Sequence, residues 1–203
     1  SVEDVLHRRS AAGLMRPADS GAVFCPEPIL ARILHHTLLG LEQMYRWLPD
    51  GGHMNMKLSN LLLDGQGTIV LADRDMPCQS LLAQTFPKAS FNTVYRLAPE
   101  VMTQPSFDQQ RADIWQLGVV AIQLYDSLLP FANIHPLKVT HLIPRSPAPM
   151  VKGPAASLGF KDFISKCCVK DPNQRADVAA LLRHPFLQTE ASAEDFVAFC
   201  ECR

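Results

Sequence analysis

The chain has few charged residues, no long apolar run and no excess of charge of either sign. Only 19% of its 203 residues are charged, against 47% that are hydrophobic, and 19 basic side chains oppose 20 acidic ones. This composition excludes disorder of the whole chain and gives no electrostatic reason to expect a nucleic acid as partner. The apolar stretches are far shorter than the roughly 18 residues of a membrane span. We therefore expect a soluble globular protein without a membrane span.

The six cysteines lack the C-x-x-C spacing that is typical of zinc sites. Cys167 and Cys168 are adjacent in a helical stretch, and Cys200 and Cys202 stand near the end of the sequence. We favour buried thiols without special chemistry. The alternative is a disulfide that ties the C-terminal tail to the rest of the chain, which would indicate a secretory compartment.

Apolar periodicity predicts a mostly α-helical protein with one small β-hairpin, folded as a single domain over residues 1–203. Apolar residues recur at helical spacing from Pro28 to Leu48, and residues 112–129 are apolar on nearly every face, as in a central buried helix. Two short apolar runs flank an Asp-Gly-Gln-Gly turn at 64–67 and predict the hairpin. Shorter helices are expected at 160–169, at 175–182 and at 193–199, the last within a tail helix over 188–203.

Five short motifs follow one another in a fixed order between residues 53 and 175. They are similar to H-R-D-x-K-x-x-N, D-F-G, T-x-x-Y-x-A-P-E, D-x-W-S-x-G and D-P-x-x-R. In this sequence they read His-Met-Asn-Met-Lys-Leu-Ser-Asn from 53, Asp-Arg-Asp from 73, Thr-Val-Tyr-Arg-Leu-Ala-Pro-Glu from 93, Asp-Ile-Trp-Gln-Leu-Gly from 113, and Asp-Pro-Asn-Gln-Arg from 171. Their order and spacing resemble those of the eukaryotic protein kinase superfamily.

The resemblance implies a protein kinase-like C-terminal lobe, with an activation-segment equivalent over residues 73–100. Residues before 53 carry no G-x-G-x-x-G loop and no lysine of the V-A-I-K type, so we expect the N-terminal β-rich lobe to be absent from this chain. The resemblance also assigns structural roles. Glu100 is expected to pair with Arg175, and Asp113 to accept backbone N–H groups from the loop around His53.

The catalytic-loop motif departs from the family at two positions. Asn55 replaces the aspartate that accepts the proton of the substrate hydroxyl, and a carboxamide is neutral and cannot act as a general base. Met54 replaces the arginine that in many kinases pairs with a phosphorylated activation loop. We therefore expect no catalytic residue in this chain.

Four other positions match residues that bind nucleotide and metal in the family. Lys57 corresponds to the phosphate-contacting lysine, and Leu62 to the apolar floor beneath adenine, so both would matter only if nucleotide binds. Asn60 and Asp73 correspond to the metal ligands, at a site that we expect to be weak or vacant. No cofactor is expected, and ATP with Mg²⁺ enters only under the alternatives below.

The D-F-G equivalent is degenerate. Arg74 stands where a phenylalanine packs into the core, and Asp75 stands where glycine permits unusual backbone angles. One hypothesis is that Arg74 or Lys57 occupies part of the magnesium site as an internal cation. The alternative is that Arg74 points into solvent.

These features favour a catalytically impaired kinase homologue, a pseudokinase, that acts as a protein-binding scaffold or allosteric regulator. Its partner would be another protein, such as an active kinase or that kinase's substrate. The alternatives are a weak or noncanonical Ser/Thr kinase whose N-lobe lies outside this chain, and an ATP-binding sensor without phosphoryl transfer. The degenerate Asp-Arg-Asp, the cysteines and the lost arginine also resemble the secreted rhoptry-type kinases and pseudokinases of apicomplexan parasites, which would imply a secretory organelle and disulfides.

Overall fold

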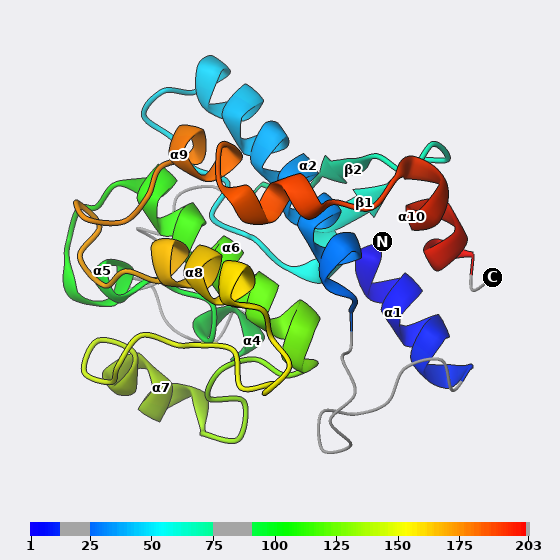
Figure 1. Cartoon of the computed structure of the whole chain (residues 1–203). Helices are drawn as coiled ribbons and strands as arrows, with labels where there is room; N and C mark the ends of the chain where they lie inside the picture. The colour runs from blue at the N-terminus through cyan, green and yellow to red at the C-terminus, as the bar shows by residue number, and fades with distance from the viewer. Residues whose placement is uncertain (13–24, 75–90, 202–203) are drawn as a thin grey trace.

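The computed structural model describes residues 1–12, 25–74 and 91–201. These residues are mostly helical and contain one two-stranded antiparallel sheet, which fits a kinase-like C-terminal lobe (Figure 1). Much of the predicted activation segment, Asp75 included, lies outside the described residues. In chain order the elements are α1 (Val2–Ala11), α2 (Glu27–Trp47), η2 (Leu58–Asn60), β1 (Leu61–Leu63), β2 (Ile69–Leu71), α4 (Phe91–Val94), α5 (Pro99–Thr103), α6 (Gln109–Asp126), α7 (Pro136–Leu142), α8 (Leu158–Cys167), α9 (Val178–Leu182), η3 (Pro185–Thr189) and α10 (Ala193–Cys200).

The long helix α2 begins with a proline in its first turn and buries one continuous face, as its apolar spacing predicts. That face packs against α6, β2, α9 and η3. The buried residues along it are Ile29, Leu30, Ala31, Ile33, Leu34, Thr37, Leu38 and Leu41. Helix α2 therefore contacts both the hairpin and the central helix. Residues 48–60, which follow α2 and lead into β1, run between these elements.

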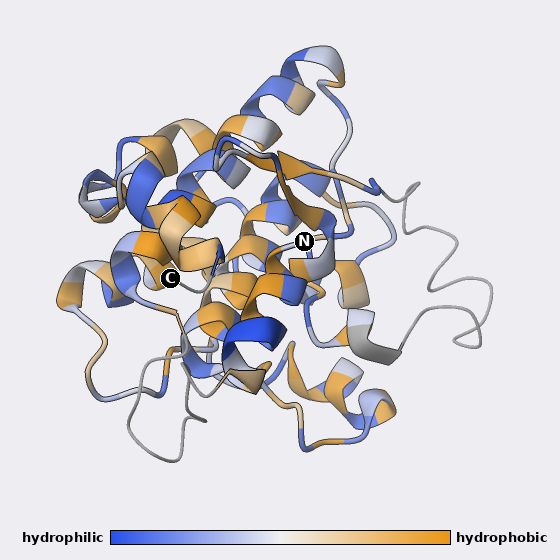
Figure 2. Ribbon diagram, turned by 90° about the vertical axis from the view of Figure 1, so that its right-hand side faces the viewer, coloured by the Kyte–Doolittle hydropathy of each residue, from blue (hydrophilic) through white to orange (hydrophobic). Residues whose placement is uncertain are grey.

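Helix α6 is the centre of the structure, and every residue from Ala112 to Ile122 is buried. The observed helix begins and ends three residues earlier than the predicted helix over 112–129. Its start is earlier because the Asp108 side chain accepts the main-chain N–H of Arg111 (3.1 Å) as an N-cap. It ends at Asp126 because Ser127 adopts a left-handed backbone, with φ 61°. Figure 2 shows apolar ribbon concentrated where helices meet inside the molecule.

The hairpin forms where predicted and pairs Leu61 with Leu71 and Leu63 with Ile69. The second strand begins at Ile69, one residue later than expected. The Asp64 carboxylate accepts the N–H of Thr68 (2.7 Å), so this residue belongs to the turn rather than to the strand.

The C-terminal helices form near the predicted positions with different bounds: α8 begins two residues before the predicted 160–169, and α10 ends one residue after the predicted 193–199. Helix α9 begins at Val178 instead of Arg175, because the Asp177 carboxylate accepts the N–H of Ala180 (2.7 Å) and caps the helix there. In the described part of the predicted tail helix, residues 188–201, the α-helix is α10, and a 3-10 turn, η3, precedes it. Among the described helices, none combines the length and apolar character needed to cross a membrane.

The favoured interpretation, buried thiols, agrees with the structure at three of the six cysteines, while Cys78 and Cys202 lie outside the described residues. Cys25, Cys167 and Cys168 are buried thiols without a disulfide. Burial raises the pKa of Cys168 to about 12, so this thiol is protonated and unreactive at neutral pH. A side chain at Gly118 would bring a Cβ within 2.6 Å of the Cys168 sulfur, which shows how closely α6 and α8 approach.

Candidate functional site

The catalytic-loop equivalent is anchored on α6 through Asp113. Its two carboxylate oxygens accept the main-chain N–H groups of His53 (2.5 Å) and Met54 (2.7 Å), which confirms the predicted contact. The sequence did not indicate a third donor, the Tyr45 hydroxyl on α2, at 2.9 Å. Asp113 therefore joins α2, the loop and α6 at one buried point.

The Asp113 carboxylate is completely buried. Burial raises its pKa to about 6, although the N–H groups of His53 and Met54, the Tyr45 hydroxyl and the charge of Arg74 all oppose that rise. The pKa of Tyr45 is raised as well, first by burial and then by the negative charge of Asp113. The phenol therefore stays protonated and keeps donating to the carboxylate.

Two glutamines of α6 hold the loop in addition. The Gln116 side-chain oxygen accepts the N–H of Met56 (3.0 Å), and that of Gln109 accepts the N–H of Gly52 (2.9 Å). A Cβ at Gly52 would lie 2.8 Å from the Gln109 carbonyl oxygen and 2.9 Å from the Asp113 carboxylate. Glycine at position 52 is therefore what lets the loop reach α6.

Asn55 and Asn60 both turn their amide groups toward Asp73. The Asn55 Nδ2 donates to the main-chain carbonyl of Asp73 at 2.9 Å, and the Asn60 Nδ2 reaches the same oxygen at 3.5 Å and the Asn55 carbonyl at 2.9 Å. Asp73 has a left-handed backbone, with φ 54°. An aspartate at position 55 could not donate this bond, because an ionised carboxylate only accepts.

The retained metal and phosphate residues lie around this contact. Asp73 is exposed, and within the described ranges neither its carboxylate nor the Lys57 ammonium forms an ion pair. Mg²⁺ prefers oxygen ligands, so the Asp73 carboxylate and the Asn60 side-chain oxygen are the groups that would hold it. Among the described residues, no group of three or more His, Cys, Asp or Glu side chains could hold a metal ion.

Arg74 is exposed, in agreement with the second alternative, but its side chain also contacts the catalytic-loop equivalent. Its Nε donates to the main-chain carbonyl of Gly52 at 2.9 Å, and its charge lowers the pKa of Asp113. The guanidinium thus supports the base of the catalytic-loop equivalent, although much of the side chain remains exposed. A hollow of about 610 Å³ beside it is lined by α2, β2 and residues 72–74. Leu62, the predicted adenine floor, is 40% exposed on the hairpin and does not line that hollow.

The predicted structural pair Glu100–Arg175 is present and fully buried. Arg175 Nη1 and Nη2 donate to the two carboxylate oxygens of Glu100 at 2.6 and 2.9 Å. The Arg175 Nε donates to the carbonyl of Val169 (2.8 Å), and the Arg175 Cζ lies 5.3 Å from the centroid of the Trp115 ring. This bidentate geometry joins the start of α5 to the segment before α9 and to the central helix.

Comparison with known proteins shows that the chain is similar to protein kinases. The protein kinase domain family model matches residues 6–187. The chain is 37% identical over 167 residues to the serine/threonine-protein kinase dst1 of Dictyostelium discoideum, covering 81% of this chain and 22% of that protein.

Myosin-IIIa of Homo sapiens is 35% identical over 175 residues, covering 83% of this chain and 11% of the myosin. Myosin-IIIa of Mus musculus is 35% identical over 177 residues, covering 84% and 11%. The chain therefore spans only about a fifth of the length of the Dictyostelium kinase and about a tenth of the length of each myosin. The family match ends before α10, which lies beyond residue 187.

Proposed function

The chain belongs to the protein kinase domain family, and from that premise we propose that it is a catalytically impaired member, whose function is to bind another protein as a scaffold or allosteric regulator. A kinase lobe has a structural role and a catalytic role, and in this chain the two are separate. The contacts that hold the lobe together, at Asp113 and at Glu100–Arg175, are all in place. The residue that should accept the proton during phosphoryl transfer is absent.

The observation that carries the proposal is the position of Asn55. Its amide N–H₂ group donates to the Asp73 carbonyl, and a carboxamide cannot accept the substrate proton at working pH. General-base catalysis contributes roughly 10²- to 10⁴-fold to a rate. The side chain at the base position is therefore used to tie the catalytic loop to the metal-binding segment.

Restoring the base tests this proposal. We expect the Asn55→Asp variant of the full chain to transfer no more phosphate from radiolabelled ATP to a generic basic protein substrate than the wild type does. The control is an Asn55→Asp, Asp73→Asn double variant, which lacks the metal carboxylate and measures contaminating activity. A gain of about 10²-fold or more in Asn55→Asp that disappears in the double variant would overturn the scaffold and favour a kinase limited by its base.

The alternative, a weak Ser/Thr kinase or an ATP sensor, is supported by the retained Lys57, Asn60 and Asp73 and by the printed name of the Dictyostelium relative. Nucleotide binding separates this alternative from the scaffold. Binding to the folded state raises the melting temperature, by an amount set by the ratio of ligand concentration to Kd. The scaffold predicts no shift with millimolar MgATP, whereas the alternative predicts a shift that Lys57→Met and Asp73→Asn both remove.

The finer resemblance to secreted rhoptry-type proteins predicts disulfides among the six cysteines. The relatives reported above give it no support, and Cys25, Cys167 and Cys168 are reduced in the structure. Thiol titration of the denatured protein without reductant tests it. Six titratable thiols would contradict a disulfide-bonded, secreted protein, and four or fewer would favour it.

A further inference from the structure

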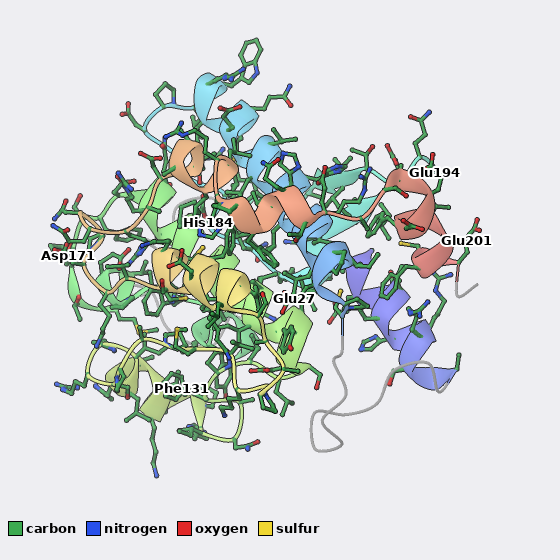
Figure 3. All side chains as sticks on the ribbon, viewed as in Figure 1. Glu27, Phe131, Asp171, His184, Glu194 and Glu201 are labelled. Atoms are coloured by element: carbon green, nitrogen blue, oxygen red, sulfur yellow. The ribbon has the colours of Figure 1, made fainter. Side chains whose placement is uncertain are left out.

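A second hollow, of about 750 Å³, lies far along the chain from the catalytic-loop equivalent, and we call it the loop pocket. Its walls are the end of α6, residues 128–134 and residues 146–154, which precede and follow α7. Figure 3 labels Phe131 on the first of these walls, beside α7. The volume is within the range of binding sites in proteins. It shares no residue with the hollow beside Asp73.

Hydrogen bonds to the main chain hold the walls of the loop pocket in place. The Lys170 ammonium donates to the carbonyl oxygens of Pro144 and Ser146, both at 2.6 Å. The Asp126 carboxylate accepts the N–H groups of residues 152 and 153, at 2.8 and 3.1 Å. Because several prolines also restrict the two loops, the pocket is formed before any ligand arrives.

The lining of the loop pocket is mostly apolar. Leu129, Phe131 and Ile134 contribute to it from one loop, and Phe131 is held at φ 62°, which L-residues rarely adopt. Leu128 and Met150 also line the pocket and are 58% and 41% exposed. Large apolar side chains left this exposed around a concave site are typical of surfaces that bind proteins.

The two charged residues that line the loop pocket differ in exposure: Asp126 is buried and Lys152 is exposed. Among the described residues, the one acid that lines it is Asp126, which is 8% exposed and already accepts two N–H groups. From residue 127 to residue 161 the sequence contains no aspartate or glutamate, but it contains Lys138, Arg145, Lys152 and Lys161. Lys152 lines the pocket and is exposed. The pocket therefore complements an apolar ligand that carries negative charge at its side.

We propose that the loop pocket is the docking site for a short segment of a partner protein that inserts apolar side chains and places acidic residues near Lys152. This inference rests on the proposed function, since it names the surface by which the scaffold holds its partner. A peptide fits better than a small molecule because Leu128 and Met150, which line the hollow, remain 58% and 41% exposed and leave a broad apolar surface. Such anchors in preformed pockets carry most of the binding energy of a protein interface.

Selection from a phage-displayed library of random short peptides on the immobilised full chain tests the proposal. The enriched peptides are expected to combine apolar residues with a net negative charge. Their binding, measured by fluorescence polarisation, should fall about tenfold or more in two variants. Ala132→Trp fills the pocket from an exposed lining position, and Lys152→Glu reverses its charge.

Two matched controls should bind like the wild type. Lys138→Glu reverses an exposed lysine of the same segment that does not line the pocket, and Trp47→Ala removes an apolar side chain that is 84% exposed elsewhere. Melting temperatures of all four variants near the wild-type value establish that they fold. Failure to enrich peptides, enrichment without acidic residues, or equal binding to Ala132→Trp would overturn the proposal.

A second copy of this chain is the competing occupant. A dimer in sedimentation that Ala132→Trp converts to a monomer would assign the pocket to self-association and also overturn the proposal. The peptide assay contains no ATP, and the loop pocket contains none of the residues tested by phosphate transfer. Loss of the docking site and discovery of kinase activity are thus separate results.

Discussion

Among the ion pairs of the described chain, Glu100–Arg175 differs from the rest by its burial, with side chains 1% and 0% exposed. Removing one partner of such a pair leaves an uncompensated buried charge. We expect Arg175→Met to lower the free energy of unfolding by about 3–5 kcal/mol, measured by urea denaturation. The exposed pair Arg46–Glu42 is the matched control, and Arg46→Met should cost less than about 1 kcal/mol. Equal losses in the two variants would contradict a structural role for Glu100–Arg175.

The raised pKa of Asp113, the carboxyl to which Tyr45 donates, predicts a pH-dependent stability. The folded-state pKa of Asp113 is about 6, above the ordinary 3.8, so the folded protein favours the protonated acid. The stability contributed by this shift is complete below pH 3.8 and is lost as the pH rises through 6. Above pH 6 the carboxylate is ionised and depends on its donors.

Tyr45→Phe should therefore cost more at pH 7.5 than at pH 5. The expected loss at the higher pH is about 1.5–3 kcal/mol, the value of a hydrogen bond to a charged group. Urea titrations of both proteins at the two pH values provide the measurement. A loss that is the same at both would mean that Asp113 does not titrate as described.

At the scale of elements, the contact between α6 and α8 depends on Gly118. A Cβ there would lie 2.6 Å from the Cys168 sulfur and 2.7 Å from the Cys167 Cβ, so the helices would have to separate. Overpacking of this kind costs about 1–3 kcal/mol, and the better helix propensity of alanine returns about 1. We expect Gly118→Ala to lower the melting temperature. Gly65→Ala, whose Cβ would meet nothing within 4 Å, should leave it nearly unchanged.

Some elements could be predicted from local sequence patterns, and the ends of others could not. Helices α2 and α6 follow from local apolar periodicity, and the hairpin from its turn residues. The predicted start of α9 was wrong for two reasons: Asp177 caps the helix through the N–H of Ala180, three residues on, and Arg175 turns inward to a partner 75 residues away. Element ends thus depended on local caps and, at Arg175, on a tertiary contact, and apolar periodicity predicts neither.

At the scale of the whole molecule, the family motifs predicted the long-range contacts of Asp113 and Glu100, because those contacts accompany the motif residues. They did not predict Tyr45, whose hydroxyl reaches Asp113 from another helix. The loop pocket was also beyond the sequence, since loops on both sides of α7 build it and no motif marks them. The main feature that the sequence did not predict is the loop pocket, to which we assign partner binding.

The most direct test of the central claim is the amount of phosphate that the wild-type chain transfers. The full chain, at micromolar concentration with excess radiolabelled ATP and Mg²⁺, is incubated with a basic protein substrate beside its Asp73→Asn variant. The account predicts that both proteins incorporate the same background of label. Transfer by the wild type that exceeds the background and is abolished by Asp73→Asn would contradict it, because phosphate would then pass at a site without the catalytic aspartate.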